Sequence, residues 1–221
     1  MRYRFLSYTI EERMPVYGGR ASVSITPVRS IARKDTANVS SISLNNHWGT
    51  HIDLPRHFFN KGASVCDHPA DFWRFSAPCV INLKLKPSEL LRWGDWAGPL
   101  RKAHDIILFR SGWGRRRARK EYGTSNPGVH PEVADILRVG FPNARAIGID
   151  WVSVSPYKDR AIGRMSHSAF LDPDGAGRPV AIIEDMDLSA PMARLSEVTV
   201  LPLRVEGIDS APVTVLGAFR D

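Results

Sequence analysis

Alternating and continuous apolar runs predict that this chain is rich in β-strands. Polar and apolar residues alternate in residues 21–25 and 39–44, a pattern typical of half-buried strands. Residues 105–109 read Asp-Ile-Ile-Leu-Phe, and the unbroken apolar run after the aspartate is typical of a strand buried on both faces. Further strands are expected at residues 78–83, 146–150, 180–184, 198–203 and 213–216.

Two segments carry the signals of a helix start. Residues 87–91, Pro-Ser-Glu-Leu-Leu, predict a short helix. In residues 130–137, Pro131 and Glu132 precede apolar residues at helical spacing, which predicts a longer helix with His130 near its cap. Because helices and strands mix without regular βαβ alternation, we expect an α/β fold that is neither a Rossmann sheet nor a TIM barrel.

The length and composition fit one folded domain that covers residues 1–221. A chain of 221 residues can bury roughly 70–75% of its unfolded surface, which supports a substantial core without disulfides. The sequence contains no Ser/Gly-rich linker, low-complexity tract or repeat at a fixed period. A single domain is therefore expected.

The same composition predicts a cytoplasmic protein with no membrane partner. Residues 1–5 lack the apolar region of a signal peptide, and no stretch approaches the roughly 18 apolar residues of a membrane span. The two cysteines, Cys66 and Cys79, are too few for a disulfide framework and are expected to be reduced. Near the first of them, His68 is expected on the surface beside a buried thiol, which is not a metal site.

The net charge of +7 is concentrated in one basic run. Five of the six residues at positions 115–120 are Arg or Lys, and without them the net charge is +2. Such a run suggests nucleic acid as a partner, but no recognised nucleic-acid module accompanies it. We therefore expect a solvated loop or short helix, and an anionic substrate attracted by the run is the alternative.

The most informative segment is residues 47–57, which read His-Trp-Gly-Thr-His-Ile-Asp-Leu-Pro-Arg-His. Its three histidines and one aspartate, His47, His51, Asp53 and His57, all lie at odd positions, so an extended backbone would direct them to one face. Same-side residues on a strand stand roughly 6.6 Å apart, so the middle two can reach one ion. A straight strand would hold the outer two on the order of 30 Å apart. The chain must therefore bend, and Gly49 and Pro55 permit the bend.

This combination of side chains predicts a metal site with hydrolytic chemistry. Imidazole and carboxylate ligands suit Zn²⁺, and also Mn²⁺ where carboxylates predominate. An ion with an open coordination position activates water and polarises a carbonyl, which favours hydrolysis of an amide, imide or lactone. His57 can then act as general acid and base, or alternatively serve as a further metal ligand. No Gly-x-Ser-x-Gly elbow or activated thiol context is present.

The same segment resembles a family pattern, His-x-Gly-Thr-His-x-Asp-x-Pro-x-His-Phe. Here it stands as HWGTHIDLPRHF, without a mismatch at the defining positions. The pattern marks the cyclase or kynurenine formamidase-like family of metal-dependent hydrolases, which act on N-formylkynurenine, isatin and related aromatic amides or lactones. Residues 107–113 and 147–150 also resemble landmarks of that family. The resemblance thus covers most of the chain.

The resemblance carries expectations for the site, the fold and the assembly. It implies that one metal ion is bound by His47, His51 and Asp53, that Asp53 bridges to a second ion held by His167 and Glu184, and that His57 transfers protons. It implies a substrate contact at Tyr17, a swivelling β/β/α fold with a central barrel-like mixed sheet and peripheral helices, and a homodimer. The bound ion or ions would be Zn²⁺ or Mn²⁺.

Three features depart from the family pattern. Phe5 stands where an acidic residue usually precedes Leu-Ser, and Ser155 stands where an Asp often follows the strand at residues 147–150. The loop at residues 172–177 is longer than in close formamidase relatives. Neither Phe5 nor Ser155 is an expected ligand, so these two affect the substrate more than the metal, whereas the longer loop, which lies between His167 and Glu184, bears on the second metal.

Two other functions remain open at this stage. A biosynthetic cyclase would use the same metal and His57 to close a ring. A non-catalytic binding protein would use the basic run at residues 115–120 to hold nucleic acid or another anion, and its binding would weaken steeply with salt.

Overall fold

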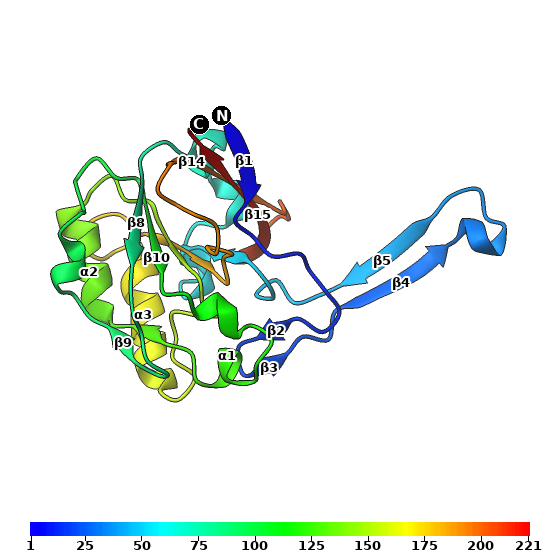
Figure 1. The fold of residues 1–221 in the computed structure, drawn as a ribbon, viewed down its shortest axis with the longest axis horizontal. Helices are drawn as coiled ribbons and strands as arrows, with labels where there is room; N and C mark the ends of the chain where they lie inside the picture. The colour runs from blue at the N-terminus through cyan, green and yellow to red at the C-terminus, as the bar shows by residue number, and fades with distance from the viewer.

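A mixed β-sheet forms the centre of the computed structural model, which describes the backbone of residues 1–221 and the side chains of residues 1–94 and 96–221 (Figure 1). Its main path has the strand order β7-β14-β15-β6-β13-β12-β10-β8, and β1 pairs with β15 off this path. The strands are β1 (Arg2–Phe5), β6 (His51–Asp53), β7 (Arg74–Phe75), β8 (Pro78–Asn82), β10 (Ile106–Arg110), β12 (Ala146–Ile149), β13 (Ala181–Glu184), β14 (Leu195–Pro202) and β15 (Ser210–Phe219). Strands β8, β10, β12 and β13 are parallel neighbours, and the remaining pairs along the path are antiparallel.

The two ends of this sheet lie close together. Strands β7 and β8 are its edge strands, and a two-residue turn joins them along the chain. The Asp105 carboxylate accepts hydrogen bonds from both backbone N–H groups of that turn, at Ser76 and Ala77. Because β14 also contacts β8, the sheet nearly closes into a barrel. The predicted α/β fold with a barrel-like mixed sheet is confirmed.

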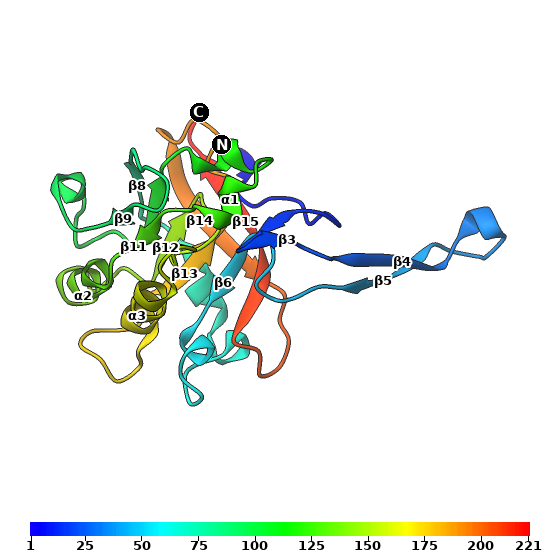
Figure 2. The same cartoon turned by 90° about the horizontal axis from the view of Figure 1, so that it is seen from below.

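Two longer helices cover one face of the parallel strands. Helices α2 (Pro131–Gly140) and α3 (Arg160–Leu171) pack against each other on that side (Figure 2). As predicted, α2 begins at Pro131, and the His130 ring caps it by accepting a hydrogen bond from the Glu132 N–H. Shorter helical segments are α1 (Glu121–Thr124) and the 3₁₀ helices Ile31–Arg33, Pro55–His57, Val65–Asp67, Ala70–Trp73, Asp95–Ala97 and Trp113–Arg116.

The central strands are buried on both faces. In β10, Ile107 and Phe109 face the core beneath the helices, whereas Ile106 and Leu108 face the core inside the barrel. The continuous apolar run predicted this double burial. Among the described residues, no helix combines the length and apolarity that a membrane crossing requires.

A long hairpin projects from this body (Figures 1 and 2). It consists of β4 (Ser24–Arg29) and β5 (Val39–Ser43), with the 3₁₀ helix Ile31–Arg33 at its tip, and every residue of both strands is exposed. We call residues 24–43 the arm. The alternation at residues 21–25 correctly marks Ala21 and Val23 as buried, but they lie before β4. The prediction of half-buried strands is wrong for β4 and β5 themselves, whose residues are all exposed. A small hairpin, β2 (Pro15–Val16) with β3 (Gly19–Arg20), precedes it.

The short helix predicted at residues 87–91 does not form. Ser88 has a φ of 60°, and the Glu89 side chain closes a turn by accepting a hydrogen bond from the Lys86 N–H. The chain then continues as β9 (Leu90–Leu91), which pairs with β11 (Gly128–Val129). Strand pairing with a distant segment therefore overrides the local helix signal.

Candidate metal centre

The bend expected in residues 47–57 is present, and it brings the outer histidines together. The extended part is limited to the three residues of β6, which lies between β13 and β15 in the sheet. Before it, Gly49 adopts a φ of 73°, a left-handed conformation that favours glycine. After it, Pro55 opens a 3₁₀ helix. As a result the rings of His47 and His57 have centroids 4.2 Å apart.

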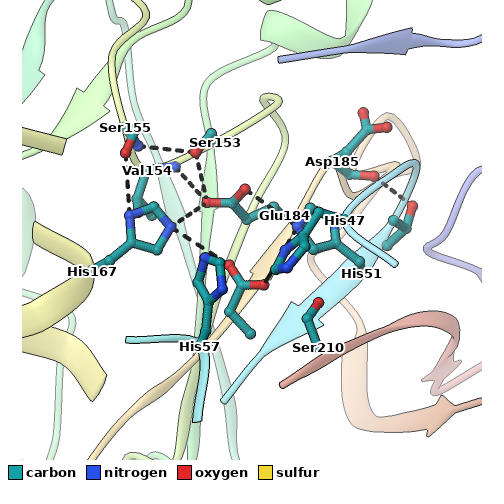
Figure 3. A network of polar contacts seen from close by, with 12 residues as sticks. His47, His51, His57, Ser153, Val154, Ser155, His167, Glu184, Asp185 and Ser210 are labelled. Atoms are coloured by element: carbon teal, nitrogen blue, oxygen red, sulfur yellow. Dashed lines mark hydrogen bonds and ion pairs between the residues drawn. The ribbon is translucent and has the colours of Figure 1, made fainter. Parts of the chain in front are cut away.

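Two further elements bring the remaining predicted residues to the same place (Figure 3). Strand β13 pairs with β6 so that Glu184 lies directly opposite His51. Helix α3 contributes His167 from its buried side. All of the predicted site residues, from both ends of the sequence, line one cavity: Tyr17, His47, His51, Asp53, His57, His167 and Glu184.

The Nε2 atoms of His51 and His167 face the same two carboxylates, Asp53 and Glu184. The Nε2 atom of His51 lies 3.6 Å from Asp53 Oδ1 and 3.5 Å from Glu184 Oε2. The Nε2 atom of His167 lies 3.5 Å from Asp53 Oδ2 and 3.5 Å from Glu184 Oε1. These separations exceed ordinary charge-assisted hydrogen bonds, and they are consistent with ligand atoms around a cation.

A backbone carbonyl fixes the ring orientation of each of these two histidines. The Nδ1–H of His51 donates to the Gly49 carbonyl at 2.8 Å, and the Nδ1–H of His167 donates to the Gly163 carbonyl at 3.0 Å. Each ring therefore turns Nε2 toward the carboxylates, and this is the nitrogen that would bind a metal ion, as in metal-binding histidines held through Nδ1. Ser155 Oγ lies 3.2 Å from His167 Nδ1, so the residue that departs from the family pattern contacts this ring.

Asp53 is the most buried member of the cluster, with 1% of its surface exposed. Its Oδ1 atom accepts no hydrogen bond from any described side chain, although His47 Nδ1 lies 3.0 Å away out of line. A buried carboxylate oxygen without a partner is costly. A cation coordinated at this point would satisfy it, so the donor set fits Zn²⁺ or Mn²⁺.

The carboxylates draw positive charge into the cavity. Although burial disfavours a charged ring, hydrogen bonds and attraction from Asp53 and Glu184 raise the pKa of His167 to about 10. Burial opposes the charged form of His47 as well, but Asp53 and Asp209 raise its pKa to about 9. Despite its burial, the surrounding imidazoles lower the pKa of Asp53 well below its usual value. Without a metal, protons on the rings balance these carboxylates.

Asp209 belongs to the site but was missed in the sequence. Its Oδ2 atom lies 2.9 Å from His47 Nε2 and 2.8 Å from His57 Nδ1, so one carboxylate oxygen joins both rings. Asn46 donates to its other oxygen at 2.9 Å. Asp209 lies just before β15, in a Gly-Ile-Asp-Ser segment with no recognisable motif. Only its position beside the histidine segment identifies it.

Glu184 is held by the segment that follows β12. The Ser153 hydroxyl and the Val154 N–H donate to Glu184 Oε1 at 3.0 and 2.7 Å. Asp150, at the start of this segment, supports a turn instead of the cavity. Its carboxylate accepts hydrogen bonds from the Ser111 N–H at 2.9 Å and the Gly112 N–H at 2.7 Å.

The cavity has a volume of about 280 Å³ and an aromatic wall. Phe58 stacks on the His167 ring at 5.1 Å, and Tyr17 packs edge-to-face on Tyr157 at 5.4 Å. Two arginines that the sequence analysis did not single out, Arg160 and Arg164, also line the cavity.

The basic run at residues 115–120 is not uniformly solvated as expected. Arg117 inserts between elements and forms an ion pair with the buried Asp185 at 2.8 Å, and its side chain is only 15% exposed. Tyr122 donates to the same carboxylate. This arginine is therefore structural, while Arg115, Arg119 and Lys120 are exposed.

The expected buried thiol beside a surface imidazole is also not found. Cys66 is half-buried, and its Sγ lies 3.4 Å from the Val205 carbonyl. His68 is half-buried as well and stacks on Phe72 at 4.0 Å. The two side chains thus have separate packing partners.

The chain is similar to known proteins over most of its length. A family model described as "Putative cyclase" matches residues 5–156. The chain is 25% identical over 210 residues to a kynurenine formamidase of Delftia acidovorans, covering 94% of this chain and 93% of the relative. It is 27% identical over 212 residues to a kynurenine formamidase of Geobacillus thermodenitrificans, with coverage of 94% and 93%.

A solved structure shares the fold. Isatin hydrolase A from Labrenzia aggregata, bound to benzyl benzoate, superposes with a TM-score of 0.79 at 19% identity. The match covers 98% of this chain and 93% of that one. A second structure, of a potential metal-dependent hydrolase with cyclase activity, gives a TM-score of 0.73 at 23% identity, with 100% and 98% coverage.

Proposed function

Because this chain belongs to the cyclase family, we propose that it is a metal-dependent hydrolase that cleaves or opens a small amide, formamide, imide or lactone. Relatives named kynurenine formamidase and isatin hydrolase indicate an enzyme that hydrolyses non-peptide C–N bonds. The observation that carries the metal dependence is the buried Asp53 carboxylate, whose Oδ1 accepts no hydrogen bond and lies near His51 Nε2, while its Oδ2 lies near His167 Nε2.

The proposed ligands are His47, His51, Asp53, His167 and Glu184. The Nε2 atoms of His51 and His167 each lie 3.5 Å from an oxygen of Glu184. Because both histidines are equally close to this carboxylate, the five residues can bind one ion or two. A bound Zn²⁺ or Mn²⁺ would supply a Lewis acid for the carbonyl and lower the pKa of water.

His57 is the proposed general acid and base. Asp209 engages its Nδ1 atom, so Nε2 is the nitrogen that would take a proton from water and return it to the leaving nitrogen or oxygen. Burial lowers the pKa of His57, so the ring is neutral and ready to accept a proton at neutral pH. For a formamide, water adds at the carbonyl carbon, the C–N bond breaks, and formate and an amine leave.

Tyr17 and Phe58 are proposed to hold the substrate. They form an aromatic wall of the cavity, and aromatic side chains provide apolar contact area for a planar ring. A small aromatic amide therefore fits the chemistry of this wall.

Metal content and two matched variants test this function. We expect the purified protein to bind Zn²⁺ or Mn²⁺ and to hydrolyse formanilide or a cyclic imide. His51→Ala should lose the metal, whereas His57→Ala should retain it and lose activity by about 10²- to 10⁴-fold. Metal retention by His51→Ala, or full activity of His57→Ala, would refute the assigned roles.

We also propose that the chain forms a homodimer through the arm. Both strands of the arm are exposed and present the apolar side chains of Ile25, Val28, Val39 and Ile42 to solvent. Exposed apolar patches on a projecting element are typical of protein interfaces. A second copy of the chain is the proposed partner.

A further inference from the structure

Helix α3 carries two arginines on the face that it turns to the metal centre. Arg160, Arg164 and His167 stand at positions i, i+4 and i+7, so they form one stripe along the helix. All three line the same cavity. At a rise of about 1.5 Å per residue, Arg164 is about 4.5 Å and Arg160 about 10 Å along the helix axis from His167. The arginines thus stand at increasing distance from the candidate ligands.

Neither arginine has an acidic partner in the described structure. The arginine–carboxylate ion pairs among the described side chains involve Arg74, Arg92, Arg117 and Arg145. The nearest acid along the chain, Asp159, accepts a hydrogen bond from the Ile162 N–H as the N-cap of α3. The described acids that line the cavity are Asp53 and Glu184, which metal binding would occupy.

The position of these arginines is unfavourable for the helix itself. Both lie in the first two turns of α3, where the helix dipole disfavours positive charge. The N-cap Asp159 carries the acidic group at this end of the helix, and the first turn contains no further acidic residue. A structural role in helix stability does not explain them.

The surroundings of Arg160 give it a defined place on the cavity wall. Its guanidinium lies 4.9 Å from the centre of the Tyr157 ring, which packs against Tyr17. Burial raises the pKa of Tyr17, and the charge of Arg160 opposes that rise. The cavity therefore combines candidate metal ligands at one side, aromatic rings along the wall and guanidinium groups toward the helix start.

We propose that Arg160 and Arg164 bind a carboxylate of the substrate, so that the enzyme prefers aromatic amides that carry this negative charge. This inference rests on the proposed hydrolytic function and narrows its substrate class. A guanidinium matches a carboxylate through two parallel hydrogen bonds. The carboxylate would then fix the aromatic ring against Tyr17 and Phe58, with the amide directed toward the metal ligands.

Kinetics with matched substrates test the proposal. Formanilide is compared with its 2-, 3- and 4-carboxylate derivatives, the formamidobenzoates, on the metal-loaded enzyme. We expect kcat/KM for at least one formamidobenzoate to exceed that for formanilide by about 10-fold or more. Arg160→Gln and Arg164→Gln should each reduce this kcat/KM by about 5- to 50-fold, mainly through KM, and leave formanilide within about twofold.

Two controls separate local binding from general charge effects. Lys158→Gln removes the same charge from an exposed position outside the cavity lining, and we expect it to change no substrate preference. Arg164→Lys keeps the charge but loses the paired hydrogen bonds, so partial activity toward formamidobenzoates is expected. Equal losses for formanilide and formamidobenzoates in the arginine variants would overturn the proposal.

A binding measurement keeps this inference separate from the proposed function. The aminobenzoates and aniline are titrated into the metal-loaded protein by calorimetry. Tighter binding of an aminobenzoate that is lost in Arg160→Gln and Arg164→Gln supports the carboxylate site even if no formamide is hydrolysed. Hydrolysis of formanilide with no preference for any carboxylate, in rate or in binding, retains the hydrolase and refutes the arginine site.

Discussion

At the residue scale, one carboxylate at this site contacts two of its histidines. Asp209 links the ring of a candidate ligand, His47, to the ring of the proposed base, His57, through one carboxylate oxygen. A carboxylate behind a histidine fixes its tautomer and raises its basicity. The proposed metal binding by His47 and the proposed proton transfer by His57 therefore both depend on Asp209, which lies more than 150 positions later in the chain.

Asp209→Asn tests this dependence. We expect kcat to fall by about 10- to 100-fold, because the amide cannot balance a proton on His57. The bound metal, measured by elemental analysis, should decrease less than in His51→Ala. Glu206→Gln, an exposed acid in the same loop, is the control and should behave as the native protein. Native turnover in Asp209→Asn would show that His57 needs no carboxylate.

The pH dependence of turnover reports on His57. Burial lowers the pKa of this ring, and a nearby cation would lower it further. A base with a lowered pKa stays deprotonated to lower pH, so we expect the acidic limb of the kcat–pH profile below pH 6.5, the usual imidazole value. This limb should vanish in His57→Ala. A limb well above pH 6.5 would contradict the assignment.

At the scale of elements, helix α3 packs closely against Ser155 at Gly163. A methyl group built at this position would lie 2.2 Å from Ser155 Oγ, and the Gly163 carbonyl anchors His167. The absence of a side chain therefore allows the helix to bring His167 to the cavity.

Gly163→Ala should disturb both stability and metal binding. Overpacking costs about 1–3 kcal/mol, and displacement of α3 would move His167 Nε2 from the carboxylates. We expect a lower midpoint of denaturant unfolding and weaker metal binding by titration. Gly140→Ala, which meets no atom within 4 Å, is the matched control. Native metal affinity in Gly163→Ala would show that the close approach does not position the ligand.

The arm is the element with the least internal support. Its apolar residues are exposed on both strands, and a two-stranded hairpin alone is marginally stable in water. Burial in a second copy of the chain is the proposed source of its stability.

Charge substitution on the arm tests the homodimer. In Ile25→Glu/Ile42→Glu, we expect light scattering to report a monomer where the native chain is a dimer. The equivalent change at Met165→Glu, an exposed apolar residue on α3, should leave the mass unchanged. A native chain that is monomeric at high concentration would refute the proposal.

At the scale of the whole molecule, the site joins distant parts of the chain. The sheet pairs β1 at residues 2–5 with β15 at residues 210–219, and the candidate ligands come from β6, β13, α3 and the segment before β6. We therefore propose that residues 1–221 unfold as one unit, with metal binding coupled to the native state.

Thermal unfolding checks this coupling. Metal at about 100 times its Kd stabilises the native state by about 2.7 kcal/mol, which raises the Tm by roughly 5–10 °C for a chain of this length. We expect a single transition that shifts with metal and returns when a chelator is added. His51→Ala should show no shift, and two separate transitions would contradict a single folding unit.

The sequence by itself determined the types of the candidate ligands, the bend at Gly49 and Pro55, the buried strand β10 and the start of α2. These features depend on neighbouring residues, through backbone conformation, side-chain chemistry and periodicity. The tertiary structure alone decided the positions of Asp209, Arg160 and Arg164 at the cavity and the ion pair of Arg117, and it placed β9 where a helix was predicted. Those outcomes depend on contacts between segments far apart in the chain, and the exposure of the arm depends on the lack of such contacts. The pattern of neighbouring residues reports on local conformation and carries no information about which distant segments meet.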